Sequence, residues 1–242
     1  MKIRCRCSAA EGCAATVIDL RSILYHINIP FFKKLLSFIY PVSLRRSEGA
    51  LNAHLEIFLY RNQLRLATAD AFYSDGDRYF PATATVADLK NFMPSVNNVL
   101  VLGAGLGSMV YVLHKKDRHP HVTLVENDKV ILRWAMEFMP DAIAQNVEPV
   151  CTDAMAFIDK NTRNYDLIFI DVFNGRVVPD FVFTPVFLGH CRNSLAPGGH
   201  VAFNYIVNEE RQWEKVNNIF SSAFPGSHVL DRGINRILIG GI

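Results

Sequence analysis

The feature that most constrains the fold is the segment NVLVLGAGLGSMVYVLH at residues 98–114. An apolar run leads into Gly103, Gly105 and Gly107, and apolar positions at helical spacing follow. A strand that ends in such a loop lets a ligand approach the backbone, because glycine has no side chain to block it. The helix then directs its free N–H groups and positive dipole end at that ligand. Glycines also permit tight packing of a helix against a strand, so the motif alone leaves both interpretations open.

Alternation of strand and helix patterns continues to near the end of the chain. Further apolar runs begin near residues 122, 147, 166 and 200, and a helical pattern follows each one. Strands buried on both faces give continuous apolar runs, so this order predicts a parallel sheet with helices on both sides. The last two runs, HVLD and NRILIG, are joined by a short turn and predict an antiparallel pair. We therefore expect an α/β fold with a doubly wound, mostly parallel sheet that ends in an antiparallel hairpin.

The residues before this region carry a different pattern. HLEIFLYRNQLRLAT, at 54–68, alternates around a polar break and predicts a β-hairpin. PFFKKLLSFIYPV, at 30–42, is too short to span a bilayer and predicts an amphipathic helix against the core or a partner. The expected parts are a tail and helix over 1–48, a small β-hairpin domain over 49–82, and the main domain over 83–242.

Composition argues against several classes of partner. A net charge of +2 gives no reason to expect nucleic acid or an acidic membrane surface. The chain has 5 cysteines in 242 residues, an odd and sparse count that indicates a reducing, cytoplasmic setting. Cys5, Cys7 and Cys13 have no fourth ligand at a zinc spacing, so we interpret them as part of a tail. We expect no metal, nucleic acid or membrane partner.

Acidic residues stand where the predicted strands end. Glu126 lies about twenty residues after the glycines, where a carboxylate can accept both hydroxyls of a ribose. Asp153 precedes a helix that begins at Ala154, which suits either a hydrogen bond from the adenine amine or a helix N-cap. Asp171 ends the fourth strand, at the edge where such folds bind ligands. Position 108 is serine, so the dinucleotide fingerprint is incomplete, and an S-adenosyl nucleoside is favoured over NAD.

From about residue 35 to residue 242 the sequence resembles the spermidine synthase-like family of S-adenosyl transferases. The resemblance rests, in family order, on LEIFLYRNQLRLATADAFYSDGDRYFP, VLVLGAGLGS, VTLVENDKVI, CTDAMAFI, YDLIFIDVFNGRVVP and LAPGGHVAFN. It implies a methyltransferase-like α/β domain behind a small N-terminal β-domain. It also implies a homodimer, since members of the family usually dimerise.

The resemblance further implies a role for individual residues. The three glycines correspond to the family's nucleoside loop. The other site residues correspond as follows: Glu126 to the ribose-binding acid, Asp153 with Ala154 to the adenine side, Asp171 to the catalytic aspartate, and Tyr73 to an aromatic residue of the acceptor pocket. Asp171 is then expected to orient an amine acceptor or take its proton, with Tyr73 beside it.

Three positions depart from the family pattern. Leu106 replaces the acid that holds the ammonium group of an aminopropyl donor, and a leucine cannot pair with that charge. Asn174 replaces a second aspartate, and Ser74 replaces a glutamine. The amino group of a donor must therefore find another partner, for which Asp75 and Asp77 are the candidates.

Three hypotheses on function follow. The first is a transferase, for methyl or aminopropyl groups, that uses S-adenosylmethionine or a relative on a small acceptor, expected to be an amine. The second is an authentic spermidine synthase that uses decarboxylated S-adenosylmethionine and putrescine, with methylthioadenosine as its product. The third is a catalytically silent module that keeps the nucleoside pocket. NGRVVPDF, at 174–181, is either a lid over the acceptor or a plain crossover loop.

Overall fold

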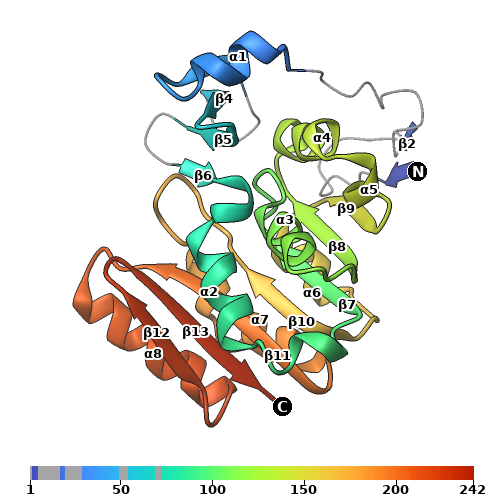
Figure 1. Ribbon diagram of the computed structural model, residues 1–242. Helices are drawn as coiled ribbons and strands as arrows, with labels where there is room; N and C mark the ends of the chain where they lie inside the picture. Colours follow the sequence, from blue (N-terminus) through green and yellow to red (C-terminus); the bar gives the residue numbers. More distant parts are fainter. Residues whose placement is uncertain (1, 5–16, 20–28, 49–53, 69–71) are drawn as a thin grey trace, which may run out of the picture.

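The computed structural model describes residues 2–4, 17–19, 29–48, 54–68 and 72–242. Three sheets are present in this part of the chain: a pair of short strands, a four-stranded sheet and a seven-stranded sheet (Figure 1). The short pair is β1 (Lys2–Arg4) with β2 (Val17–Asp19). Cys5, Cys7 and Cys13 lie outside the described residues, so the interpretation of these cysteines stays a prediction.

The main sheet has the order β12-β13-β11-β10-β7-β8-β9. Its strands are β7 (Asn98–Leu102), β8 (His121–Glu126), β9 (Val147–Cys151), β10 (Tyr165–Ile170), β11 (Leu195–Ile206), β12 (His228–Arg232) and β13 (Asn235–Gly241). β7 to β11 are parallel to one another, whereas β13 pairs antiparallel with β11 and β12. The expected α/β fold, with its doubly wound sheet and C-terminal hairpin, is confirmed.

Helices cover both faces of this sheet (Figure 1). They are α2 (Phe80–Asp88), α3 (Ser108–Lys115), α4 (Lys129–Phe138), α5 (Asp141–Ala144), α6 (Ala154–Asp159), α7 (Pro185–Asn193) and α8 (Glu210–Ala223). Alternate residues of β7 explain the continuous apolar run, because Val99 and Val101 join the core beneath α2 and α3, whereas Leu100 and Leu102 join the core beneath α7 and α8. None of the helices in the described part of the chain is both long and apolar enough to cross a membrane.

The small sheet is built from β3 (Val42–Ser47), β4 (Leu55–Tyr60), β5 (Gln63–Ala67) and β6 (Phe72–Ser74), all antiparallel and in that order. β4 and β5 confirm the expected hairpin, and the two residues of its turn, Arg61 and Asn62, have positive φ angles of 50° and 56°. In the segment assigned to tail and helix, the helix expected within residues 30–42 is α1 (Phe31–Leu36), and β3 follows it as a strand that was not expected. β3 is an outer strand with few apolar residues, so it shows little of the alternation by which a strand is detected.

A third apolar cluster joins the two sheets. Leu55, Ile57 and Leu66 of the small sheet meet Leu106, Ile131 and Trp134, which come from the glycine loop and α4. Full burial of each aliphatic side chain stabilises the fold by about 1.5–3 kcal/mol. The small sheet is thereby held over the glycine loop, while the division of the chain at residues 48 and 82 stays a prediction.

The first prediction concerns Leu106, which is 3% exposed inside this cluster. We expect Leu106→Asp to lower the free energy of unfolding by about 3–5 kcal/mol, because it buries a charge without a partner. Leu106→Met, which conserves volume, should cost less than about 1.5 kcal/mol. Urea denaturation measures both values, and equal effects of the two substitutions would contradict this account of the cluster.

Candidate active site

A cavity of about 260 Å³ opens at the carboxyl ends of β7, β8 and β10. β7 lies between β8 and β10 in the sheet, so the chain reverses its direction of winding at this point. Open α/β sheets bind ligands in the crevice that such a reversal creates. The cavity lining contains six of the predicted binding and catalytic residues: Gly103, Gly105, Glu126, Asp153, Ala154 and Asp171.

The three glycines are needed, or used, in different ways at their three positions. A Cβ atom on Gly103 would lie 2.1 Å from the carbonyl oxygen of Asp171, so glycine is required where the ends of β7 and β10 meet. Gly105 lines the cavity and, like Gly103, has a positive φ angle. Gly107 is instead the N-cap residue of α3, and it is not among the lining residues. Tight packing and access to the backbone therefore both apply at Gly103.

Glu126 is held rigidly in the wall of the cavity. The backbone N–H of Ala104 donates to its Oε2 atom at 3.1 Å, and that of Asp128 donates to Oε1 at 3.0 Å. Burial raises the pKa of Glu126, and these backbone hydrogen bonds partly offset the rise. Asp128, also in the lining, caps α4 through Oδ1, which accepts from the N–H of Val130 at 2.8 Å.

Asp153 is the N-cap residue of α6. Its Oδ1 atom accepts a hydrogen bond from the N–H of Ala156 at 3.0 Å. The capping interpretation therefore holds in the structure, and it is compatible with a second role because Asp153 and Ala154 both line the cavity.

Asp171 lies at the centre of a polar network. Its Oδ1 atom accepts from the hydroxyl of Tyr79 at 3.1 Å and from Nδ2 of Asn204 at 2.8 Å. Oδ1 of Asn204 accepts in turn from Nδ2 of Asn235 at 3.0 Å. Burial raises the pKa of Asp171 to about 6, although both donors pull it down. The network joins Asp171, at the end of β10, to the residue before α2, to Asn204 near the end of β11 and to the first residue of β13.

The aromatic residue that contacts Asp171 is thus Tyr79, six positions after Tyr73. Tyr73 belongs to β6, but its side chain lies outside the described part of the structure, so its expected role stays a prediction. Burial and the charge of Asp171 raise the pKa of Tyr79 well above its usual range, so its hydroxyl remains a donor. Sequence reasoning missed Asn204 as well, although a lone amide inside the apolar run VAFNYI was a usable signal.

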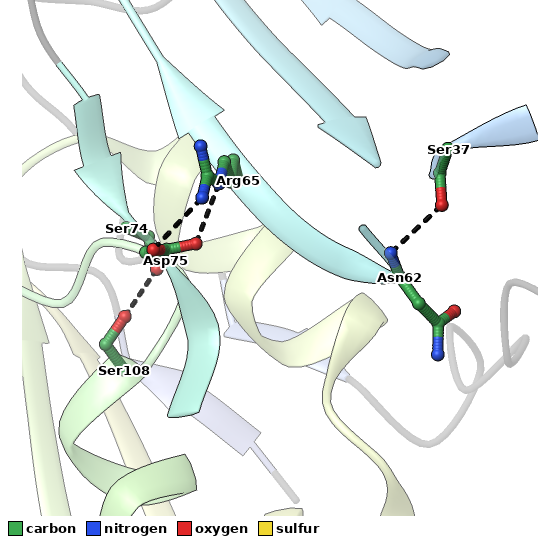
Figure 2. Close-up of polar contacts among 6 residues, drawn as sticks. All are labelled: Ser37, Asn62, Arg65, Ser74, Asp75 and Ser108. Carbon is green, nitrogen blue, oxygen red and sulfur yellow. Dashed lines mark hydrogen bonds and ion pairs between the residues drawn. The ribbon is translucent and has the colours of Figure 1, made fainter. Parts of the chain in front are cut away.

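Both acids proposed as substitute partners for the donor already form ion pairs within the chain. Asp75 accepts two hydrogen bonds from Arg65, at 2.7 and 3.2 Å (Figure 2). Asp77 pairs with the ammonium group of Lys115 at 2.9 Å. Neither is among the described residues that line the cavity, and the expectation that one of them holds a donor's amino group stays a prediction. Ser74, which replaces the family's glutamine, makes a buried hydrogen bond of 2.6 Å to Ser108 at the start of α3.

The segment after β10 closes one side of the cavity. Asn174 and Val177 exchange two backbone hydrogen bonds, of 2.9 and 3.1 Å, across a tight turn at Gly175. Asn174, Gly175 and Pro179 all line the cavity. The chain then forms the short helix η4 (Asp180–Phe183) before α7.

Comparison with known families decides the membership of this chain. A model of the spermine/spermidine synthase domain matches residues 84–227. The chain belongs to this family. The matched residues include most of the motifs on which the resemblance was based, and that resemblance is confirmed.

The individual relatives that match this chain share 29–32% of their residues with it over about half of its length. The polyamine aminopropyltransferase of Lachnoclostridium phytofermentans is 32% identical over 110 residues, 44% of this chain and 39% of that protein. The corresponding enzyme of Vibrio vulnificus is 29% identical over 130 residues, 52% of this chain and 43% of that protein. An N-terminal histidine N-methyltransferase of Emericella nidulans is 31% identical over 116 residues, 45% of this chain and 20% of that protein. The matches to the two aminopropyltransferases span about two fifths of their length.

Solved structures show the same fold. A probable spermidine synthase from Corynebacterium glutamicum has a TM-score of 0.66 at 20% identity, over 84% of this chain and 80% of that one. Human methyltransferase-like protein 13 in complex with SAH has a TM-score of 0.56 at 20% identity, over 68% of this chain and 80% of that one. The fold is therefore that of spermidine synthases and methyltransferases.

The second prediction tests the contact between Gly103 and Asp171. We expect Gly103→Ala to lower the free energy of unfolding by about 3 kcal/mol or more, since two strand ends must move apart. Gly198 also has a positive φ angle but has nothing near its missing Cβ, so Gly198→Ala should cost only about 1–2 kcal/mol. Thermal or urea unfolding measures both, and a smaller effect at Gly103 than at Gly198 would refute the contact.

Proposed function

We propose that this chain is a transferase that moves an alkyl group from the sulfonium of an S-adenosyl donor to a small amine. One observation carries the proposal: Gly103, Gly105, Glu126 and Asp171 meet in a single cavity at the winding reversal of the sheet. Membership of the spermine/spermidine synthase family supports it.

The charge of the cavity fits such a donor and acceptor. Four carboxylates line it, those of Glu126, Asp128, Asp153 and Asp171, and no Lys, Arg or His is present among the described lining residues. A concave site lined by one sign of charge attracts ligands of the opposite sign. A sulfonium and a protonated amine are both cations, so the lining favours them together.

The rest of the lining suits the nucleoside. The fixed carboxylate of Glu126 would accept hydrogen bonds from two ribose hydroxyls, because each of its oxygens retains a lone pair beyond the backbone contact. The absence of side chains at Gly103 and Gly105 would let the nucleoside lie against the backbone. Asp153 and Ala154 would face the adenine edge.

Asp171 would act on the acceptor. Tyr79 and Asn204 both donate to Oδ1, so Oδ2 is the oxygen left to accept a hydrogen bond from an amine. The carboxylate would orient the acceptor and take a proton from the ammonium group, which frees the nitrogen lone pair to attack the carbon beside the sulfonium. The C–N bond forms as the C–S bond breaks, and the sulfur keeps the electron pair.

Aminopropyl transfer from decarboxylated S-adenosylmethionine to putrescine is the second candidate. The cavity offers no cation, among its described residues, to a donor carboxylate, so a donor without that group fits better. The names of two relatives, polyamine aminopropyltransferases, point the same way. Buried Leu106 and the amide of Asn174 argue against it, because both replace carboxylates expected around cationic substrates.

The deciding experiment incubates the purified protein with putrescine and each donor in turn, with mass spectrometry of the products. Spermidine and methylthioadenosine indicate aminopropyl transfer, whereas a methylated amine and S-adenosylhomocysteine indicate methyl transfer. If Asp171→Asn left donor binding unchanged and no amine tested gave a product, the proposal would be wrong, and the chain would be a nucleoside-binding module without catalytic activity.

The third prediction concerns the binding of methylthioadenosine. We expect Glu126→Gln to weaken it by about 10- to 100-fold, the equivalent of losing charge-assisted hydrogen bonds worth about 1.5–3 kcal/mol. Glu148→Gln is the matched control, since Glu148 pairs with Arg163 on the surface and is not in the lining. Isothermal titration calorimetry measures both. Equal affinities for the two variants would remove Glu126 from the binding site.

The fourth prediction concerns pH. With a base whose pKa is about 6, kcat/KM should rise as pH increases through 6, because only ionised Asp171 can take a proton. Tyr79→Phe removes a hydrogen bond that lowers this pKa, so the midpoint should move to higher pH. If the midpoint did not move in Tyr79→Phe, the rise of kcat/KM with pH would have to reflect the ionisation of a group other than Asp171.

A further inference from the structure

The acids that line the cavity are unevenly distributed across the sheet. Three of them, Glu126, Asp128 and Asp153, stand at or just after the ends of β8 and β9. Asp171 follows β10, which lies on the other side of β7 (Figure 1). Neighbouring strands are about 4.8 Å apart, so β9 and β10, three positions from each other, are separated by roughly 14 Å. Asp171 is therefore the one carboxylate that the described lining residues supply on the side of β10 and β11.

The apolar lining residues of this side come from three elements. Ile206 is two positions after Asn204 on β11, so both side chains project from the same face of the sheet. Asn204 donates to Asp171, so Ile206 stands at the same end of the sheet as that carboxylate. Phe173 is half-buried and packs against the core beneath α7 and α8. The hydroxyl of Tyr79 is already bound to Asp171, so its ring is what it offers to a ligand.

The polar residue at the rim of this side is the neutral Asn174. It is exposed, and its backbone is fixed by two hydrogen bonds with Val177. A hydrogen bond from an ammonium group to a carboxylate is about twice as strong as one between neutral groups, and an amide supplies no charge. Burial and the charges of Glu209 and Asp180 raise the pKa of Tyr205 on β11, so both acids lie near this side. Neither acid is among the described residues that line the cavity.

We infer that the acceptor is a monoamine with an apolar body, and not a diamine. The inference rests on the proposed function, in which the nucleoside fills the side of β7, β8 and β9 and leaves the other side to the acceptor. Oδ2 of Asp171 would hold the single ammonium group, and the body of the amine would lie against Ile206 and Phe173. A second ammonium group in that place would lose water without gaining a carboxylate.

The test compares pentylamine with putrescine, which have the same length and differ by a methyl group in place of one ammonium group. The purified full chain is incubated with each amine, with S-adenosylmethionine and with its decarboxylated form, and kcat/KM is measured by mass spectrometry of the products. We expect pentylamine to be favoured by about tenfold or more, the size of effect that one group in a pocket produces. Calorimetry with methylthioadenosine present measures the affinity for each amine without any turnover.

Asn174→Asp tests the cause of the preference. It adds a second carboxylate at the rim, so we expect the ratio of putrescine to pentylamine, in affinity and in kcat/KM, to rise by about tenfold, the equivalent of about 1.4 kcal/mol. Asn218→Asp is the matched control, because Asn218 is exposed on α8 and is not in the lining. The control adds the same charge elsewhere and should leave the ratio unchanged. Circular dichroism establishes that both variants are folded.

The outcomes separate this inference from the proposed function. Putrescine that is used as well as pentylamine, or a ratio that Asn174→Asp does not change, would overturn the inference and leave the proposed function in place. A preference for the longer diamine 1,8-diaminooctane would also overturn it, and would indicate that Asp180 or Glu209 holds the second ammonium group. Preferential binding of pentylamine without transfer from either donor would contradict the proposed function and support the inferred specificity. Failure to bind any amine would overturn both.

Discussion

The contact between Gly103 and the backbone of Asp171 is the constraint on which the site depends. A Cβ atom on residue 103 would lie 2.1 Å from the carbonyl oxygen of Asp171, so the end of β7 can approach the residue after β10 this closely only with glycine at position 103. The glycine loop and Asp171 then border the same cavity. Glu126 follows from the neighbouring strand β8, whose carboxyl end is at the same edge of the sheet.

Two asparagine side chains, linked by hydrogen bonds, connect Asp171 to the last strand of the chain, β13. Asn204 on β11 and Asn235 on β13 meet because these strands are paired antiparallel at the edge of the parallel sheet. Asn235 donates to Asn204, and Asn204 in turn donates to Oδ1 of Asp171 and leaves Oδ2 free of this network. The C-terminal hairpin is thereby more than a closing element, since it orients a carboxylate that belongs to a strand near the middle of the sheet.

The sequence predicted the parts of the molecule that depend on local pattern. Continuous apolar runs predicted β7, β8 and β10, and the rule that ligands bind at strand ends was enough to assign Glu126 and Asp171 to one edge of the sheet. Tyr79 and Asn204 could not be placed in the same way. Tyr79 precedes α2 in a loop, and Asn204 depends on the register between β10 and β11, which shifts near Tyr165. Contacts between distant segments are set by register and packing, which single-sequence patterns do not encode.

Leu106 shows how the two halves of the chain constrain each other's chemistry. It closes the apolar cluster that joins the small sheet to the glycine loop, together with Leu66 and Trp134. A carboxylate at this position would face that cluster, where a charge without a partner is strongly unfavourable. The small sheet is thus secured by a side chain at the position where the family pattern has an acid for a donor's ammonium group. The described residues that line the cavity supply four carboxylates, those of Glu126, Asp128, Asp153 and Asp171, so the negative charge of this chain lies in the cavity and not at residue 106.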